Sequence, residues 1–173
     1  EMAELKKTGK CKALIVTGCM AQRYKQEIID EIPEVDGILG TSTYDEISNV
    51  LKQALGGEGY VSCFHDLNAL PEVETSRIIT TGGHYAFLKI AEGCDKHCTY
   101  CIIPSLRGNY RSVPMERLLK EANELADQGV RELILVAQET TLYGVDLYGK
   151  KMLPELLHKL AEIPGIYWIR IQY

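Results

Sequence analysis

Short apolar segments alternate along this chain with longer segments of helical periodicity. The apolar segments, rich in β-branched residues and Leu, predict buried strands at 13–16, 37–40, 86–91, 132–137 and 167–171. The segments between them predict helices at 1–8, 22–32, 43–55, 115–128 and 152–162, with Thr43 and Glu46 at the spacing of a capping box. Repeated strand–helix units of this kind favour an α/β fold with parallel sheets.

Changes in composition divide the chain into three parts. Residues 1–57 alternate strand and helix but are too short for a whole α/β domain. Residues 58–82 are rich in Gly, Glu, Pro, Ser and Thr without periodicity, and they predict a linker or an extended crossing segment. Residues 83–173 predict the opening units of a parallel (β/α) barrel. Because the chain begins with Glu1 and ends in a strand-like segment, we expect a piece of a longer protein.

Charge and hydropathy limit the classes of partner. The net charge is −5 and no basic block appears, so direct nucleic-acid binding is not evident in this part of the protein. No apolar run approaches the roughly 20 residues that a membrane helix needs, and no signal peptide is visible. We therefore expect a cytoplasmic protein without membrane contact.

Three of the six cysteines lie close together, directly after a predicted strand. Cys94, Cys98 and Cys101 have the spacing C-x3-C-x2-C. Clustered cysteines in a chain without a secretory signal indicate metal or redox ligands, and thiolates hold cuboidal iron–sulfur clusters. Three thiolates leave one iron open to a substrate. A loop at the C-terminal end of a barrel strand is also where barrel enzymes work.

Two other metal sites have to be considered for this loop. A zinc site would pair the cysteines with His84 or His97, but zinc ligands usually come as two C-x2-C pairs and no second pair is present. An electron-transfer cluster would need a fourth cysteine nearby. The spacing favours the cluster with an open iron, while a non-catalytic metal-binding module remains the alternative of another class.

Four segments of the chain resemble the methylthiotransferase branch of the radical S-adenosylmethionine (SAM) enzymes. They are 17–23, 35–41, 89–108 and 138–144. The resemblance implies the C-terminal half of an N-terminal α/β methylthiotransferase domain, followed by the first β/α units of a radical SAM TIM-type barrel. The family's C-terminal TRAM domain is absent from this chain.

The resemblance implies two [4Fe–4S] clusters in the full-length protein. Cys94, Cys98 and Cys101 match the ligands of the cluster that binds and cleaves SAM, which yields a 5′-deoxyadenosyl radical. Cys19, in a Thr-Gly-Cys segment after a strand, matches the third ligand of the second cluster. The other two ligands would lie upstream. Cys11 and Cys63 match no ligand position and are expected to be partly buried small apolar residues.

Further residues are implied as SAM contacts. Tyr100 corresponds to an aromatic near the SAM adenine, although it would also serve as an ordinary loop aromatic. Gln138 and Glu139 follow a predicted strand where the superfamily often binds the SAM amino group; capping or solvating the loop is the other interpretation. Arg107 and Arg111 are equally suited to bind SAM, cluster sulfides or substrate, or to be surface charges.

Three more segments indicate which class of substrate the resemblance implies. Residues 138–149, 153–157 and 168–173 resemble the enzymes that modify an aspartate of a small-subunit ribosomal protein, with Gln172 a departure from an apolar position. That branch implies hydrogen abstraction from the aspartate β-carbon, transfer of a methylthio group from the second cluster, and an external electron donor. Transfer-RNA adenosine methylthiolation is the alternative within the family.

Overall fold

The structure, a computed structural model, describes residues 2–57, 59–69, 77–80 and 82–172. Parts of the expected linker, at 58, 70–76 and 81, lie outside the described residues, as does the first residue of the expected 1–8 helix. The chain divides into two compact units. The first holds Glu1–Val73 and Ser105–Arg107, and the second holds Glu74–Pro104 and Gly108–Tyr173.

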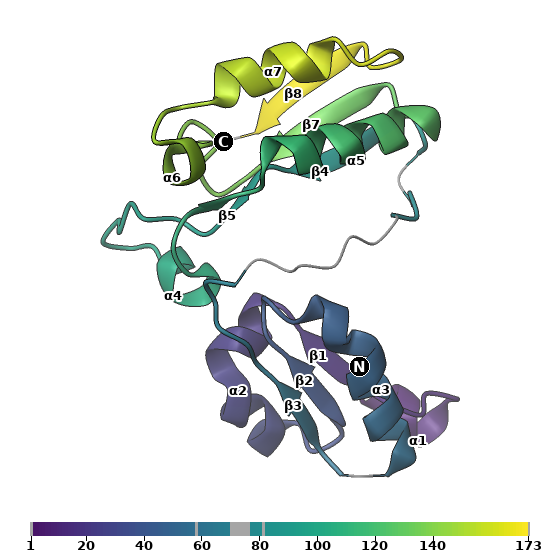
Figure 1. The fold of residues 1–173 in the computed structure, drawn as a ribbon. Coiled ribbons are helices and arrows are strands. Elements are labelled where there is room, and N and C mark those ends of the chain that lie inside the picture. Colours follow the sequence, from purple (N-terminus) through teal and green to yellow (C-terminus); the bar gives the residue numbers. More distant parts are fainter. Residues whose placement is uncertain (1, 58, 70–76, 81, 173) are drawn as a thin grey trace. The chain divides into compact units, whose positions relative to one another are not determined.

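The first unit is built on a small parallel sheet. Its strands, in spatial order, are β1 (Ile15–Thr17), β2 (Gly37–Leu39) and β3 (Val61–Cys63). Helices α2 (Cys19–Glu31) and α3 (Ile47–Gly56) connect and contact these strands, and α1 (Glu4–Thr8) precedes them (Figure 1). β3 lies within residues 58–82, for which the composition predicts a linker or an extended crossing segment; a three-residue strand is too short to produce a periodic signal.

The expected capping box at Thr43 is wrong. The Thr43 side chain makes no cap; its hydroxyl donates to the backbone oxygens of Cys63, at 3.1 Å, and Gly40, at 3.3 Å. A short 3-10 helix, Tyr44–Glu46, comes before α3 instead. The buried hydroxyl is used to join the ends of β2 and β3, which is a tertiary contact that local spacing cannot reveal.

The second unit repeats the strand–helix pattern with parallel strands. Its sheet has the order β4 (Tyr85–Lys89), β7 (Glu132–Val136) and β8 (Trp168–Gln172). Helices α5 (Met115–Asp127) and α7 (Leu153–Ala161) lie side by side over one face of the sheet (Figure 1). This order of neighbouring parallel strands confirms the expected α/β class and is the arrangement with which a (β/α) barrel begins.

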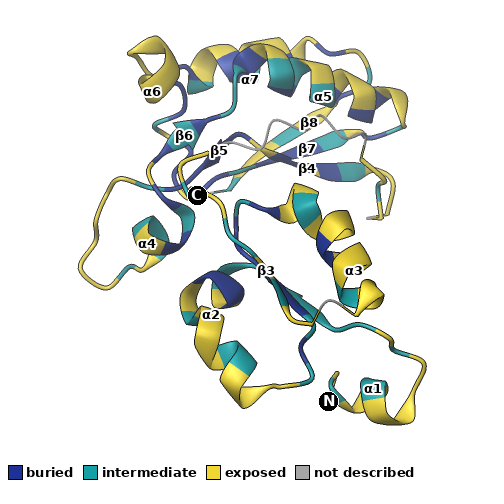
Figure 2. Cartoon of the chain, turned by 60° about the horizontal axis from the view of Figure 1, so that its bottom comes forward, coloured by how far each residue is buried: buried dark blue, intermediate teal, exposed yellow. Residues whose placement is uncertain are grey.

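The core of the second unit lies between this sheet and its two helices. Alternate strand residues point to the helices, and both layers contribute fully buried leucines, shown in dark blue in Figure 2. They are Leu88, Leu133, Leu135, Leu118, Leu156 and Leu160, each 0% exposed. This apolar layer fixes the strand ends from which the site loops leave.

Four short elements lie between β4 and α7 along the chain. The predicted strand 86–91 breaks after Lys89, and β5 (Ala91–Glu92) pairs antiparallel with β6 (Arg111–Ser112). Helices α4 (Ile103–Arg107) and α6 (Val145–Tyr148) follow the loops after β5 and β7. The strand breaks because Ile90 leaves the β4 direction: its carbonyl accepts the Val113 N–H at 2.9 Å.

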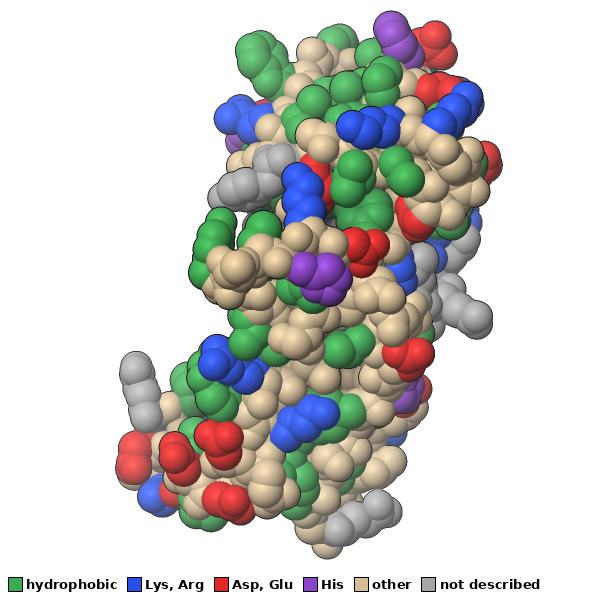
Figure 3. All heavy atoms as spheres, turned by 90° about the vertical axis from the view of Figure 1, so that its left-hand side faces the viewer, with side chains coloured by type: hydrophobic (Ala, Val, Ile, Leu, Met, Phe, Trp, Pro, Cys, Tyr) green, Lys and Arg blue, Asp and Glu red, His purple; other side chains and the backbone are tan. Residues whose placement is uncertain are grey.

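The described surface carries charges of both signs. On the face seen in Figure 3, acidic and basic side chains are scattered among apolar ones. Within the described residues, no helix is long and apolar enough to cross a membrane.

Candidate functional site

The cysteine loop is closed at its base by backbone contacts. β5 and β6 pair with Ala91 opposite Ser112 and Glu92 opposite Arg111, so the chain leaves and returns at adjacent points. Beyond this pair, the Cys94 N–H donates to the Gly108 oxygen at 3.2 Å. The cysteine loop therefore leaves the sheet and returns to it at the same place. This closure holds the side chains of the loop near the carboxyl end of β4.

A glycine at the start of the loop permits this closure. Gly93 has φ +76°, and a Cβ added there would lie 2.1 Å from the Asn109 oxygen and 2.6 Å from the Gly108 oxygen. Neither neighbour is a side chain that can rotate away. Only glycine allows both the left-handed backbone and the close approach of the returning chain.

Asp95 fixes the two arms of the loop to each other. Its carboxylate accepts the backbone N–H of Tyr110 at 2.9 Å. Tyr110 is 7% exposed, and burial raises the pKa of its hydroxyl to about 12. Asp95 is not among the residues predicted from the sequence, where the only available signal was its place between two candidate ligands.

All three candidate ligands lie on this one loop. Cys94 and Cys101 are half-buried and Cys98 is exposed, and the Cys101 N–H donates to the Cys98 oxygen at 2.9 Å. In the described part of the chain, no three His, Cys, Asp or Glu side chains converge enough to hold a single metal ion. A cubane fits this donor set, because each of its thiolates binds a different iron and the three need not meet at one point.

Glu139 lies just beyond β7, where the sequence placed it. Its side chain is 10% exposed and forms an ion pair with Lys96, which comes from the middle of the cysteine loop. Its other oxygen, Oε1, accepts the Thr141 N–H at 3.0 Å and also the Thr141 hydroxyl. Hydrogen bonds from Lys96, and then from Thr141, hold the pKa of Glu139 below its ordinary value, and Glu139 raises the pKa of Lys96. Neither Lys96 nor Thr141 is among the residues predicted from the sequence.

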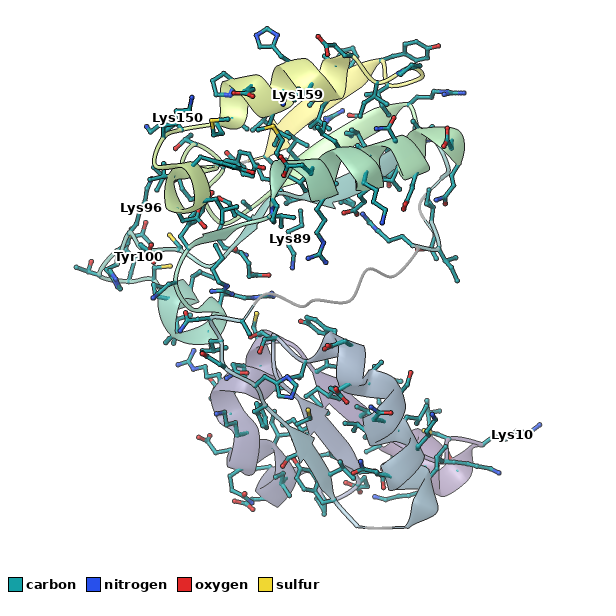
Figure 4. The ribbon with its side chains drawn as sticks, viewed as in Figure 1. Lys10, Lys89, Lys96, Tyr100, Lys150 and Lys159 are labelled. Carbon is teal, nitrogen blue, oxygen red and sulfur yellow. The ribbon has the colours of Figure 1, made fainter. Side chains whose placement is uncertain are left out.

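Gln138 and Tyr100 are open to solvent in this chain. Gln138 is exposed and lies two residues after β7, and Tyr100 has 92% of its surface exposed. Tyr100 and Lys96 lie on the same loop between β5 and α4 (Figure 4). An aromatic side chain that only fills a gap in a loop is usually less exposed than Tyr100 is.

A buried polar network supports the base of the loop. Ser112 donates its N–H and its hydroxyl to the Asp146 carboxylate, at 2.8 and 2.6 Å, and its hydroxyl oxygen accepts the Gly144 N–H at 2.9 Å. Tyr148 accepts the Met115 N–H at 3.0 Å. These contacts join β6 to α6 and to the start of α5. The cysteine loop, which ends at β6, and the loop after β7, which leads to α6, are therefore supported by one hydrogen-bond network.

Cys19 stands at the first position of α2 in the first unit. The preceding Gly18, with φ +100°, turns the chain from β1 into the helix. The Arg107 guanidinium donates Nε–H to Cys19 Sγ at 3.2 Å, and the Leu106 oxygen accepts the Thr41 hydroxyl at 2.8 Å. Of the two candidate arginines, Arg107 contacts a candidate ligand; Arg111 donates instead to the Asn109 oxygen.

The other two cysteines are half-buried, which agrees with their expected packing role. Cys11 Sγ lies 3.3 Å from the Ala13 oxygen, and Cys63 Sγ lies 3.8 Å from His65 Nε2. Burial raises the pKa of the Cys63 thiol.

Comparison with known families matches both parts of the chain. The model of the radical SAM superfamily matches residues 88–173, and that of the uncharacterized protein family UPF0004 matches residues 1–40. The first match contains the cysteine loop and Glu139, and the second contains Cys19.

Curated relatives match along the whole chain. A ribosomal protein uS12 methylthiotransferase RimO from Lachnoclostridium phytofermentans is 69% identical over all of this chain and 39% of its own length. Proteins of the same name from Clostridioides difficile and Desulforamulus reducens are 53% and 48% identical, over 99% and 100% of this chain and 38% and 39% of their own. The chain thus spans about two fifths of the length of these relatives. Their shared name does not favour the transfer-RNA alternative.

Proposed function

We propose that this chain belongs to the radical SAM superfamily and is part of an enzyme that adds a methylthio group to an aspartate of a small-subunit ribosomal protein. The observation that carries the proposal is 69% identity over the full chain to a protein named as a uS12 methylthiotransferase. The closed cysteine loop supports it, since it presents three thiols at the end of a β/α strand.

Each candidate residue has a role in this proposal. Cys94, Cys98 and Cys101 hold a [4Fe–4S] cluster, and Cys19 supplies one ligand to a second cluster whose other ligands lie outside this chain. When bound, the first cluster and SAM supply a radical able to remove an unactivated hydrogen atom. Acid–base catalysis is unsuited to this step, because the aspartate β-carbon carries no acidic proton.

The chain's own side chains position SAM. Glu139, 10% exposed and held by Thr141, offers a carboxylate oxygen to the SAM amino group. Gln138 offers an amide beside it, and the exposed ring of Tyr100 offers an apolar face for the adenine. The electron comes from an external donor, and the reaction takes place in the cytoplasm, where the ribosomal substrate is found.

The test uses the full-length protein, reconstituted anaerobically with iron and sulfide. With SAM and a reductant, the parent is expected to release 5′-deoxyadenosine, and Cys98→Ala is expected to release none. Cys11→Ala is the matched control, because it removes a half-buried cysteine outside the loop. Equal product from Cys98→Ala and the parent would contradict the enzymatic assignment.

The substrate is tested separately by mass spectrometry. Ribosomal protein uS12 from cells lacking the gene should lose a methylthio group from one aspartate, while methylthioadenosine in transfer RNA stays unchanged. The opposite pattern would assign the enzyme to the transfer-RNA branch.

A further inference from the structure

Glu139 holds a cation already, and that cation belongs to the chain itself. The Lys96 ammonium forms an ion pair with Oε2 of Glu139, while Oε1 accepts both hydrogen bonds from Thr141. The two carboxylate oxygens therefore have different partners. Oε1 is fixed to the loop of Glu139 itself, and Oε2 faces the positive charge of Lys96.

The two partners of the ion pair differ in how firmly they are held. The Glu139 side chain is 10% exposed, whereas the Lys96 side chain is 54% exposed and comes from the cysteine loop. A long side chain exposed to this degree gains little from an ion pair and can leave it at low cost. Glu139 would stay in place without Lys96, because Thr141 still holds Oε1.

The SAM amino group can donate hydrogen bonds as the lysine side chain does. Both groups carry N–H donors on a flexible carbon chain, and both are suited to the same carboxylate oxygen. Within the described residues, Lys96 is the partner of Oε2, so the lysine and the SAM amino group would compete for one acceptor.

We propose that Lys96 occupies the SAM amino-group position of Glu139 in the SAM-free protein, and that SAM binds by displacing this lysine. The inference rests on the proposed function, which assigns Glu139 to SAM. Lys96 keeps the buried carboxylate paired while the site is open, and it lowers the apparent affinity for SAM because its ion pair has to be broken first.

The experiment measures SAM binding rather than turnover. Full-length, cluster-loaded protein is dialysed to equilibrium against SAM without a reductant, so SAM is not cleaved. Lys96→Met is expected to tighten SAM binding by about two- to fivefold, the effect of losing one partly exposed ion pair. Lys96→Arg keeps the competing charge and should bind SAM as the parent does. Bound iron is measured for each variant, and Lys96→Gln provides a second neutral side chain if the Met variant loses iron.

A matched control separates competition from general electrostatics. SAM carries a net positive charge, so removing any nearby lysine favours its binding to some extent. Lys89 pairs with Glu92 at 2.7 Å, with side-chain exposures of 55% and 11% that closely match those of Lys96 and Glu139. Lys89→Met is expected to tighten SAM binding less than Lys96→Met. Equal effects of the two variants, or weaker binding by Lys96→Met, overturn the proposal.

Glu139→Gln distinguishes a failure of this inference from a failure of the proposed function. The variant is expected to weaken SAM binding and to abolish the gain from Lys96→Met, because the two side chains act as one pair. A gain that persists in the Glu139→Gln background overturns the displacement proposal alone. If Glu139→Gln binds SAM as tightly as the parent, the assignment of Glu139 to SAM is wrong.

Discussion

Arg107 Nε donates a hydrogen bond to Cys19 Sγ at 3.2 Å, although 88 positions separate the two residues. Arg107 lies six positions after Cys101, the last cysteine of the loop, yet residues 105–107 pack with the first unit. The segment that leaves one candidate cluster loop thus contacts the candidate ligand of the other. Hydrogen bonds to cluster sulfurs tune iron–sulfur clusters, so the proposed ligand role of Cys19 gives this contact a consequence that can be tested.

Replacing Arg107 should make the second cluster harder to reduce. Arg107→Ala removes a positive N–H donor from the Cys19 sulfur, and the reduced, more negative cluster loses more stabilisation than the oxidised one. We expect a more negative midpoint potential, with methylthiolation lowered about 10- to 100-fold. The potential is measured by redox titration of full-length protein in which Cys94, Cys98 and Cys101 are replaced by Ala.

Lys52→Ala provides the control for this shift, because it removes an exposed charge from α3 in the same unit. An unchanged potential in Arg107→Ala would show that Arg107 does not act on the cluster.

Gly93→Ala should prevent the cysteine loop from closing. The added Cβ would lie 2.1 Å from the Asn109 oxygen, so the returning chain has to move away. We expect the full-length protein to bind about one four-iron cluster fewer. Gly129→Ala is the matched control: it has φ +97° with nothing within 4 Å of the added Cβ. That variant should lose only about 1 to 2 kcal/mol of stability and keep its iron. Normal iron in Gly93→Ala would contradict the proposed loop closure.

Ser112→Ala should destabilise the protein by about 1 to 3 kcal/mol. Ser112 is 0% exposed, and its loss leaves an Asp146 oxygen and the Gly144 N–H without the hydroxyl that joins them. Urea unfolding of the full-length protein measures the change. Ser48→Ala, at an exposed position of α3, should be neutral or slightly stabilising. Equal stability of the two variants would argue against the supporting network.

Asp36 should make the first unit sensitive to acid. Burial is the strongest single influence on this carboxyl and acts to raise its pKa, but hydrogen bonds from Lys6 and the Leu14 N–H, both at 2.7 Å, together lower it. Because the folded pKa lies below the unfolded one, the stabilisation is complete above the ordinary value of 3.8 and is lost as the pH falls through the lowered pKa.

Asp36→Asn tests this dependence. At neutral pH the variant should lose about 1 to 2 kcal/mol, as expected for hydrogen bonds to a charged group. The difference from the parent should disappear in acid, below the folded pKa. Hydrogen exchange of the Leu14 amide in the full-length protein reports the local opening. A difference that is independent of pH would assign the effect to packing rather than to charge.

Much of the fold could be predicted from local patterns. β4, β7 and β8 match apolar runs, and α5 and α7 match amphipathic segments, because a buried strand or helix face needs consecutive residues of the right kind. β3 and β6 were missed, since two or three residues carry no periodicity. Thr43 was misassigned because its hydroxyl bonds to Cys63, which lies 20 positions away.

The sequence by itself determined the α/β class and the positions of the three clustered thiols, because strand–helix alternation and cysteine spacing are properties of neighbouring residues. It also located Glu139 at the end of a strand. Only the tertiary structure decided that Lys96 pairs with Glu139 and that Arg107 donates to Cys19. These partners lie on loops whose paths depend on the packing of the sheets beneath them, so no pattern in the neighbouring sequence specifies which side chains will meet.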